Sequence, residues 1–253
     1  MIKIALNGCN GRMGKVLQEL ISKREDCSVI YGIDLNNAEK TDFPVFTDFA
    51  AIPENLKADV IIDFSHPKAV RNLLDYSISS KTPTVIATTG IAKEDMEYLK
   101  EAGKSVAVFH SANMSIGICL LKALVQKAAL FLGDDFDIEI VERHHNQKLD
   151  APSGTALAIA DAINNACDEK FEYIYDRHSR SAKRGKTEIG ISAVRGGSII
   201  GDHEVIFAGN NEVIEVNHKA QSRNVFADGA VKAALFLASK PAGLYSMESM
   251  INM

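Results

Sequence analysis

The first half of the chain alternates short apolar runs with amphipathic stretches. In the stretch 12–22, apolar residues recur at the three- and four-residue spacing of one helix face. The same spacing predicts helices at 68–80 and 93–102, and short apolar runs predict strands at 2–6, 28–33, 59–64, 84–87 and 105–109. Strands separated by helices of this length predict right-handed βαβ units and a parallel sheet.

After about residue 114 the pattern changes. The apolar run 116–132 predicts a long helix, and 135–143 alternates apolar with charged residues, as in a strand with one wet face. Further helices are predicted at 153–166 and 225–238, and β-branched runs at 188–194, 204–208 and 212–217 predict an antiparallel or mixed sheet. We therefore expect an α/β protein of two domains, residues 1–113 with 222–253, and residues 114–221.

A glycine-rich turn, Gly8-Cys-Asn-Gly11-Arg-Met-Gly14, joins the first strand to the first helix. Its spacing, GxxGxxG, is a variant of the dinucleotide fingerprint, in which glycines let the backbone approach a pyrophosphate at a helix N-terminus. Asp34 ends the second strand 20 residues after Gly14, where a carboxylate accepts hydrogen bonds from an adenosine ribose. The turn predicts a Rossmann-like dinucleotide-binding domain; the alternative is a plain tight turn.

Small polar residues follow two later strands. Thr88-Thr89-Gly90 comes after the run 84–87, and Ser111-Ala112-Asn113-Met114 comes after 105–109. Ligands of open parallel sheets bind beyond the carboxyl ends of the strands. Both segments are therefore candidates to line the nicotinamide half of a cofactor, although each is also a common loop sequence.

The segment from Glu142 to Leu157, ERHHNQKLDAPSGTAL, carries the strongest chemical signal. A predicted strand ends at two histidines, a lysine follows, and Ala-Pro-Ser-Gly-Thr begins a helix. Pro152 suits the opening turn of that helix, with Ser153 or Asp150 as its cap. The backbone N–H groups of Ser153, Gly154 and Thr155 should then be exposed, and with Lys148 and a histidine they would form an anion site, most simply for a carboxylate.

Other interpretations of this segment are weaker. A zinc site is disfavoured because there is no HExxH motif and adjacent histidines on a strand point to opposite faces. A purely structural role for the pair stays open. We expect structural roles for the histidines outside this segment, which are His66, His110, His178, His203 and His218.

Composition narrows the function classes. The net charge is −5 and no basic block is present, which argues against a dedicated nucleic-acid binder. The four cysteines form no CxxC pair, and without a signal peptide they suggest reduced thiols in a cytoplasmic protein. Lys122, Gln126 and Lys127 interrupt the run 116–132, so we expect a core or interface helix there and no membrane span. The basic stretch 177–186 is expected to be a solvated, mobile loop.

At this point the sequence resembles the dihydrodipicolinate reductase family, now called 4-hydroxy-tetrahydrodipicolinate reductases, over essentially the whole chain. The resemblance rests on GCNGRMG, DFSHP, ATTG, SANMSIG, ERHHNQKLDAPSGTAL and SRNVFADGAVKAA. It implies hydride transfer from NADH or NADPH to a cyclic unsaturated dicarboxylate, giving tetrahydrodipicolinate, a precursor of diaminopimelate and lysine. It also implies a cytoplasmic homotetramer, assembled through a second α+β domain that binds substrate.

The resemblance also implies roles for individual residues. His144 would exchange a proton with the substrate, and Lys148 would donate a proton and bind a carboxylate. The implied substrate-binding residues are His145, Ser153, Gly154, Thr155 and Arg223. The implied cofactor residues are Gly8, Cys9, Asn10, Gly11, Arg12, Met13, Asp34, Ala87, Thr88, Thr89, Ser111, Ala112, Asn113 and Met114; no metal is implied.

Two positions depart from many relatives. Met114 stands where an aromatic residue is common, which can alter nicotinamide packing, and Leu35 stands where some relatives have arginine. Because Asp34 would repel the extra phosphate of NADPH and Leu35 supplies no cation, we expect NADH to be preferred and NADPH to be accepted. The alternatives are another nicotinamide-dependent dehydrogenase of a small dicarboxylate and a non-catalytic NAD-binding regulator.

Overall fold

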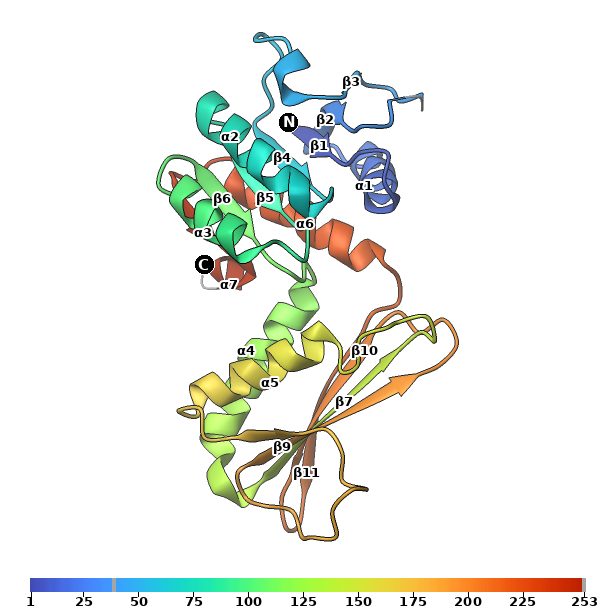
Figure 1. The fold of residues 1–253 in the computed structure, drawn as a ribbon, viewed down its shortest axis with the longest axis vertical. Helices are drawn as coiled ribbons and strands as arrows, with labels where there is room; N and C mark the ends of the chain where they lie inside the picture. The colour runs from blue at the N-terminus through green and yellow to red at the C-terminus, as the bar shows by residue number, and fades with distance from the viewer. Residues whose placement is uncertain (38–39, 252–253) are drawn as a thin grey trace. The chain divides into compact units, whose positions relative to one another are not determined.

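The computed structural model describes residues 1–37 and 40–251. The chain divides into two compact units, each described by itself (Figure 1). Unit 1 comprises Met1–Ser115 and Asn224–Met253, and unit 2 comprises Ile116–Arg223. Each division falls two residues after the position expected from the sequence, so Arg223 is the last residue of unit 2.

Unit 1 is built on a seven-stranded parallel sheet of order β12-β6-β5-β4-β1-β2-β3. Its strands are β1 (Ile2–Asn7), β2 (Cys27–Ile33), β3 (Val45–Phe46), β4 (Val60–Asp63), β5 (Thr84–Ile86), β6 (Ala107–His110) and β12 (Gly243–Tyr245). Its helices are α1 (Arg12–Ser22), α2 (Val70–Ser80), α3 (Lys93–Ala102), α6 (Asn224–Leu237) and α7 (Met247–Ile251). The α/β fold expected from the sequence is confirmed.

The strand order changes direction between β1 and β4. From β1 the chain proceeds to β2 and β3 on one side, and from β4 it proceeds to β5, β6 and β12 on the other. Such a switch point leaves a crevice outside the carboxyl ends of the two central strands, where open α/β sheets bind their ligands. The loops after β1 and β4 therefore occupy the expected ligand edge of the sheet.

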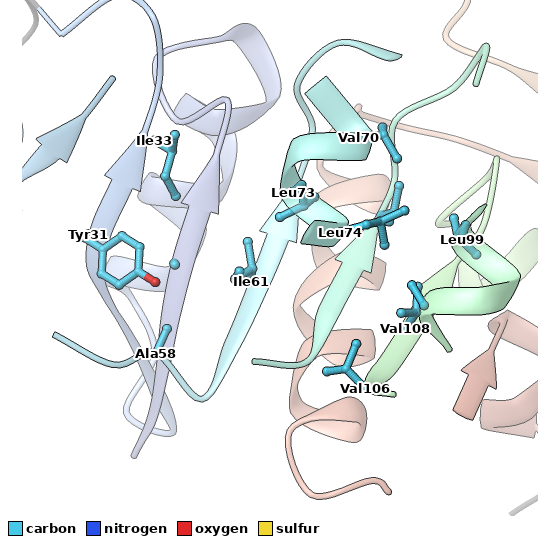
Figure 2. Packing of buried hydrophobic residues seen from close by; sticks show 13 residues of the cluster. Tyr31, Ile33, Ala58, Ile61, Val70, Leu73, Leu74, Leu99, Val106 and Val108 are labelled. Atoms are coloured by element: carbon cyan, nitrogen blue, oxygen red, sulfur yellow. The ribbon is translucent and has the colours of Figure 1, made fainter. Parts of the chain in front are cut away.

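One face of this sheet packs against α2 and α3 (Figure 2). On α2 the buried residues Val70, Leu73, Leu74 and Ser77 follow the spacing of a single helix face. They meet strand residues such as Ile61, which is fully buried. Helix α6 packs against α1, β4 and β5, so the sheet is held by helices of both chain segments of unit 1.

Unit 2 contains a five-stranded mixed sheet of order β11-β10-β7-β9-β8. Its strands are β7 (Asp137–His144), β8 (Glu172–Ile174), β9 (Glu188–Arg195), β10 (Asp202–Ala208) and β11 (Val213–Lys219), and its helices are α4 (Ile116–Leu132) and α5 (Gly154–Ala166). The central strand β7 pairs parallel with β9 and antiparallel with β10. This arrangement confirms the expected mixed sheet.

The alternation along β7 decides which residues face the core. Burial alternates strictly along the strand, and Ile138, Ile140, Glu142 and His144 form the buried set. Ile138 and Ile140 pack with residues of α4 and α5 in one hydrophobic cluster. Because side chains two residues apart share a face of a strand, the same alternation places Glu142 and His144 beside each other at the end of β7.

Helix α4 is long and strongly apolar. By length and composition alone the stretch Ile116–Asp135, with a mean hydropathy of 1.7, could cross a membrane. One face of α4 nevertheless packs into the core of unit 2 through Leu121, Val125 and Ala129. This packing agrees with the core or interface helix expected from its polar interruptions.

Two local expectations are wrong. Pro152 is not in the opening turn of α5: a cis peptide bond joins it to Ala151, and the helix begins at Gly154 with Ser153 as its N-cap. The basic stretch 177–186 is not a simple solvated loop either, because its arginines pair with acids of β7 and β9. Arg177 bonds Glu139 and Glu188, Arg180 bonds Glu188, and Arg184 bonds Asp137 and Glu139.

Candidate active site

The glycine turn after β1 has the geometry that a close approach of backbone requires. Gly8 has a φ of +81°, and a Cβ at this position would lie 2.8 Å from the carbonyl oxygen of Phe64. A Cβ on Gly14 would lie 2.2 Å from the carbonyl oxygen of Cys9, so this glycine lets α1 pack closely on the turn. Helix α1 begins at Arg12, with Gly11 as its N-cap, and its first N–H groups face the end of the turn.

Asp34 binds the glycine turn from the end of β2. Its carboxylate accepts hydrogen bonds from the backbone N–H of Asn10 at 2.9 Å and from that of Asn36 at 3.0 Å. Leu35, by contrast, is 90% exposed and supplies no charge beside the carboxylate. Asp34 therefore both shapes the turn and presents a carboxylate at the position expected for a ribose contact.

A cavity of about 640 Å³ opens at this edge of unit 1. Its volume lies within the roughly 300–1,000 Å³ range of small-molecule and cofactor sites. Three of the predicted cofactor residues, Gly8, Gly11 and Asp34, line it, together with Leu35, the position considered for cofactor choice. The lining also includes residues not singled out for a cofactor: Asn7, Ile33, Thr47, Asp48, Phe49, Phe64, Ser65, His66, Lys68, Ala69 and Asn72. A positive-φ glycine turn, a helix N-terminus and a carboxylate around one cavity fit a dinucleotide.

Next to this cavity, a buried carboxylate connects the ends of three parallel strands. Asp63, the last residue of β4, is fully buried. It accepts hydrogen bonds from Asn7 Nδ2 at 2.8 Å, Ser65 Oγ at 2.5 Å and Thr88 Oγ1 at 2.7 Å. We call these four residues the Asp63 cluster. Burial raises the pKa of Asp63, and the hydrogen bonds from the three neutral side chains do not offset it.

The other predicted cofactor residues all belong to unit 1, but they are not among the residues that line the cavity. Cys9, Ala87, Thr88 and Met114 are buried, Arg12, Thr89 and Ala112 are exposed, and Asn10, Met13, Ser111 and Asn113 are partly buried. Ser111 and Asn113 are joined in a tight turn by a hydrogen bond from Ser111 Oγ to the Asn113 carbonyl at 2.7 Å. The burial of Met114 places its side chain within the fold of unit 1.

In unit 2 the end of β7 brings a histidine onto a carboxylate. His144, which is 8% exposed, places its Nδ1 atom 2.6 Å from Oε2 of the fully buried Glu142. The two residues are two positions apart on one strand, which is why they share a face. His145 lies at the next position and is more exposed, so the adjacent histidines have different environments.

Glu142 is held by two further donors. Arg195 of β9, the register partner of His144, donates from one guanidinium nitrogen to Oε2 at 2.8 Å and from another to Oε1 at 2.7 Å. The backbone N–H of Ser153 donates to Oε1 at 2.9 Å. Burial alone would raise the pKa of Glu142, but the hydrogen bonds from Arg195, His144 and Ser153 outweigh it and the pKa is lowered. We call these four residues the Glu142 cluster.

His203 lies against this cluster. It is the register partner of Glu142 on β10, its ring packs edge-on against that of His144 at a centroid distance of 5.3 Å, and its Nε2 lies 3.1 Å from Ser153 Oγ. Burial, reinforced by repulsion from His144, lowers the pKa of His203 to about 3. We expected only a structural role for His203, and the sequence did not indicate its contact with His144, the candidate catalytic histidine.

The backbone anion site is only partly as expected. The N–H of Ser153 is not exposed, because it donates to Glu142. The Ser153 hydroxyl accepts from the N–H of Ala156 at 3.2 Å and so caps α5. Gly154 is exposed, and a Cβ there would meet no atom within 4 Å. The N-terminus of α5 is therefore exposed at Gly154, whose N–H interacts with the Asp150 carboxylate, and Thr155 next to it is partly buried.

Lys148 lies on the connection between β7 and α5. Its Nζ is 2.8 Å from Oδ1 of Asp150, and its side chain is 22% exposed. The Lys148 ammonium, with smaller help from the backbone N–H of Gly154, holds the pKa of Asp150 below its usual range. The lysine is thus already paired with a carboxylate in the fold. Arg223 is exposed at the end of unit 2.

Glu142, Arg195 and His203 were not predicted as functional residues. Glu142 could have been found, because a strand that ends in Glu-x-His places both side chains on one face. Arg195 and His203 reach the site only through the pairing of β9 and β10 with β7. In the described ranges 1–37 and 40–251, no group of three or more His, Cys, Asp or Glu side chains is arranged to hold a metal ion.

Comparison with known proteins shows the family of this chain. Residues 2–114 match the family described as dihydrodipicolinate reductase, N-terminus, and residues 117–251 match dihydrodipicolinate reductase, C-terminus. The 4-hydroxy-tetrahydrodipicolinate reductase of Caldanaerobacter subterraneus subsp. tengcongensis is 51% identical, with 100% of this chain and 99% of the relative covered. The enzyme of the same name from Clostridium tetani is 47% identical, with 100% and 98% covered.

A solved structure has the same fold. The dipicolinate-bound dihydrodipicolinate reductase of Paenisporosarcina sp. TG-14 matches with a TM-score of 0.81 at 24% identity, over 97% of each chain. At that identity the likeness supports the fold, whereas the sequence matches carry the family assignment. The chain therefore belongs to the dihydrodipicolinate reductase family, the NAD(P)H-dependent oxidoreductases of lysine and diaminopimelate biosynthesis.

Proposed function

We propose that this chain reduces 4-hydroxy-tetrahydrodipicolinate to tetrahydrodipicolinate with NADH or NADPH, and that His144 and Lys148 perform the proton and carboxylate chemistry. The observation that carries the proposal is His144 itself. It is an acid–base side chain in the segment most specific to the family, and a buried carboxylate holds its Nδ1 atom. A solved relative binds dipicolinate, a cyclic dicarboxylate, which supports a substrate of the same class.

The chemistry divides between hydride and proton. In the proposed reaction the substrate loses water to give a conjugated imine, which then gains one hydride and one proton. The bound dinucleotide supplies the hydride. His144 donates the proton, because an acid placed at the reacting system lowers the barrier to forming the enamine-like product.

Lys148 and the start of α5 hold the substrate carboxylates. The Lys148 ammonium exchanges its ion pair with Asp150 for one with the substrate, and it is a second proton source. The exposed N-terminus of α5 at Gly154 and Thr155 accepts a carboxylate, since the first N–H groups of a helix favour anions. His145, Ser153 and Arg223 complete the proposed substrate set.

An assay with two variants tests these roles. The condensation product of pyruvate and aspartate semialdehyde is supplied with NADH, and NADH oxidation is followed. His144→Ala should lower kcat by about 10²–10⁴-fold with little change in KM, the usual cost of losing an acid–base group. Lys148→Ala should lower kcat and raise KM. Two folded variants that both remain within about threefold of the parent enzyme contradict the assignment, and NADH binding without turnover by the parent favours the regulator.

For the cofactor, we propose a preference for NADH with NADPH accepted. Asp34 uses its carboxylate on two backbone N–H groups and can also accept from a ribose diol, whereas the phosphate of NADPH would meet a like charge. Such a clash is worth roughly 1–3 kcal/mol, about tenfold to a hundredfold in affinity. Asn36 and Asn37 follow Asp34 in the sequence, and Arg12 belongs to the glycine turn. As neutral donors and a nearby cation, these residues reduce the cost of binding the NADPH phosphate.

The exposed Leu35 gives a direct test of cofactor choice. Leu35→Arg should improve kcat/KM for NADPH and leave that for NADH about unchanged, because the new guanidinium can pair with the phosphate. The two cofactors are compared at one salt concentration. A parent enzyme that favours NADPH contradicts the proposed role of Asp34.

The assembly and compartment are also proposals. We propose a homotetramer in the cytoplasm, as the family resemblance implies. The four cysteines of this chain form no disulfide, which is compatible with a reducing compartment. Light scattering on the purified protein should give the mass of four 27.5-kDa chains; a monomer mass contradicts the tetramer.

A further inference from the structure

The proposed function uses His144 but leaves the buried carboxylate beside it without a role. We propose that Glu142, held in place by Arg195, is the positioning residue for His144: it keeps the ring proton on Nδ1, so that Nε2 is the nitrogen that exchanges a proton with the substrate. This inference rests on the proposed role of His144. It concerns which nitrogen acts and what fixes it, which the family assignment does not state.

Every oxygen of Glu142 is used as an acceptor. Oε2 accepts from His144 Nδ1 at 2.6 Å and from Arg195 at 2.8 Å. Oε1 accepts from Arg195 at 2.7 Å and from the Ser153 N–H at 2.9 Å. The bidentate guanidinium fixes the plane of the carboxylate, and the fixed carboxylate in turn fixes the plane of the imidazole ring.

The charge on Glu142 determines the tautomer of His144. A guanidinium is a donor only, and an ionised carboxylate is an acceptor only. The carboxylate paired with Arg195 therefore offers His144 nothing but an acceptor, and Nδ1 must be protonated to bond it. In the neutral ring this leaves the lone pair on Nε2, and in the doubly protonated ring the proton on Nε2 is the one that can pass to the substrate, because the Nδ1–H stays bonded to Glu142.

The surroundings of His144 Nε2 leave this nitrogen room to exchange a proton with the substrate. A Cβ on Gly201 would lie 3.0 Å from His144 Nε2, so the absence of a side chain at residue 201 leaves space beside this nitrogen. The ring of His203 packs edge-on against that of His144 and restricts its rotation. The ring is thus constrained by a hydrogen bond on one side and by packing on the other.

Glu142→Gln changes this arrangement with almost no change in shape. The single oxygen of glutamine is best placed where Oε1 lies, because one nitrogen of Arg195 and the Ser153 N–H both donate there. The other Arg195 nitrogen, which donates to Oε2 in the parent, then keeps only its bond to the Val194 carbonyl. The NH₂ group of the glutamine then faces Nδ1 of His144, which becomes an acceptor, and the ring proton moves to Nε2. The substitution should therefore reverse the tautomer of the neutral ring, and it removes the acceptor that Nδ1–H needs in the doubly protonated ring that donates the proton.

The matched control lies on the same strand. Glu139 also bonds two arginines, Arg177 and Arg184, but it belongs to the other face of β7, since burial alternates along the strand. Glu139→Gln removes one carboxylate charge from the same strand and leaves the pairing of His144 intact. This variant should keep the parent tautomer of His144 and the parent values of kcat and KM.

The test combines spectroscopy with kinetics on the full chain. Histidine-selective ¹⁵N labelling, assigned with His144→Gln, reports which ring nitrogen is protonated at a pH where the ring is neutral. The parent and Glu139→Gln should show the proton on Nδ1, and Glu142→Gln should show it on Nε2. Glu142→Gln should also lower kcat at least tenfold, and by no more than the roughly 10²–10⁴-fold cost of losing the acid–base group itself, with KM changed less than about threefold.

The outcomes separate this inference from the proposed function. A parent enzyme with the neutral ring protonated on Nε2 overturns the inference, and this measurement needs no variant of Glu142 to fold. A Glu142→Gln protein that keeps its kcat while His144→Gln loses activity also overturns it and leaves the proposed function standing. A His144→Gln protein with full activity overturns the proposed function itself. In the His144→Gln background, Glu142→Gln should cause no additional loss of kcat, and an additive loss contradicts the coupling.

Discussion

Each unit buries a carboxylate near the end of a central strand, and the two are stabilised differently. Asp63 of β4 accepts hydrogen bonds from the neutral side chains of Asn7, Ser65 and Thr88, and burial raises its pKa. Glu142 of β7 accepts from Arg195 and His144, and its pKa is lowered despite burial. A carboxylate buried among neutral donors thus has a raised pKa, whereas one paired with a guanidinium has a lowered pKa despite its burial.

The difference in pKa between Asp63 and Glu142 fits two different roles for the two clusters. The Asp63 cluster joins the ends of β1, β4 and β5 through hydrogen bonds from neutral side chains, next to the cavity of unit 1. The Glu142 cluster holds a carboxylate with a lowered pKa against His144, as the proposed positioning role requires. Three predictions test this distinction, in order of expected effect.

Removal of the charged partner should have the largest effect. Arg195→Met leaves the carboxylate of Glu142 buried without its guanidinium, and breaking a buried ion pair typically costs about 3–5 kcal/mol. Thr88→Val removes one neutral donor from Asp63 and should cost about 1–3 kcal/mol. Urea unfolding of both variants measures the difference. A loss for Arg195→Met no larger than that for Thr88→Val would remove the basis of the comparison.

The second prediction concerns His203, whose pKa falls from 6.5 to about 3 in the fold. Between these values the unfolded chain binds more protons than the folded one, so stability falls as pH falls below 6.5. At pH 5 the loss from this histidine should be about 2 kcal/mol relative to pH 8.

A pair of variants isolates this contribution. His203→Gln should remove this part of the pH dependence of the free energy of unfolding, whereas replacement of the exposed His178 by Gln should leave it in place. Urea titrations at pH 5 and pH 8 give the comparison. Equal pH slopes for the parent and His203→Gln would show that another group is responsible.

The smallest effect is expected at Asp63. Asp63→Asn can keep its oxygen on Asn7 and Ser65 while its NH₂ faces Thr88, whose hydroxyl can turn to accept. We expect a change in stability within about 1 kcal/mol at pH 7, since the hydrogen bonds are exchanged and not lost.

The pH dependence at Asp63 has the opposite sign to that at His203. A raised carboxyl pKa gives stability that is fully present below 3.8 and is lost as pH rises through the folded-state value. Asp63→Asn should abolish that dependence. If the variant instead costs as much as Arg195→Met, Asp63 is a permanent anion and the two clusters are alike.

The fold was accessible from the sequence because its patterns are local. Helices α1 and α3 occupy the ranges their periodicity indicated, 12–22 and 93–102. Errors arose where a distant partner decides the structure. The basic stretch 177–186 looks solvated until the acids of β7 and β9 are placed beside it.

The candidate site shows the same limit. His144, Lys148 and the cap at Ser153 lie in one continuous segment and could be proposed from it. Arg195 and His203 are 51 and 59 residues from His144 in the sequence, and they meet it only because β9 and β10 flank β7 in a particular register. A shift of that register by one residue would turn both side chains to the other face, and no local pattern fixes it.

The division of unit 1 into two chain segments has a consequence for synthesis on the ribosome. Its sheet strands β1–β6 are complete by residue 110, but α6, whose buried face includes Ala230, Val231 and Leu237, begins at residue 224. At about 5–20 residues per second, the intervening stretch takes roughly 5–20 s to translate. During that interval the nascent sheet lacks the helix that packs on β4 and β5, whereas unit 2 is continuous and can fold as soon as it emerges. The packing of unit 1 is therefore completed only when its second chain segment, which begins at Asn224, has been made.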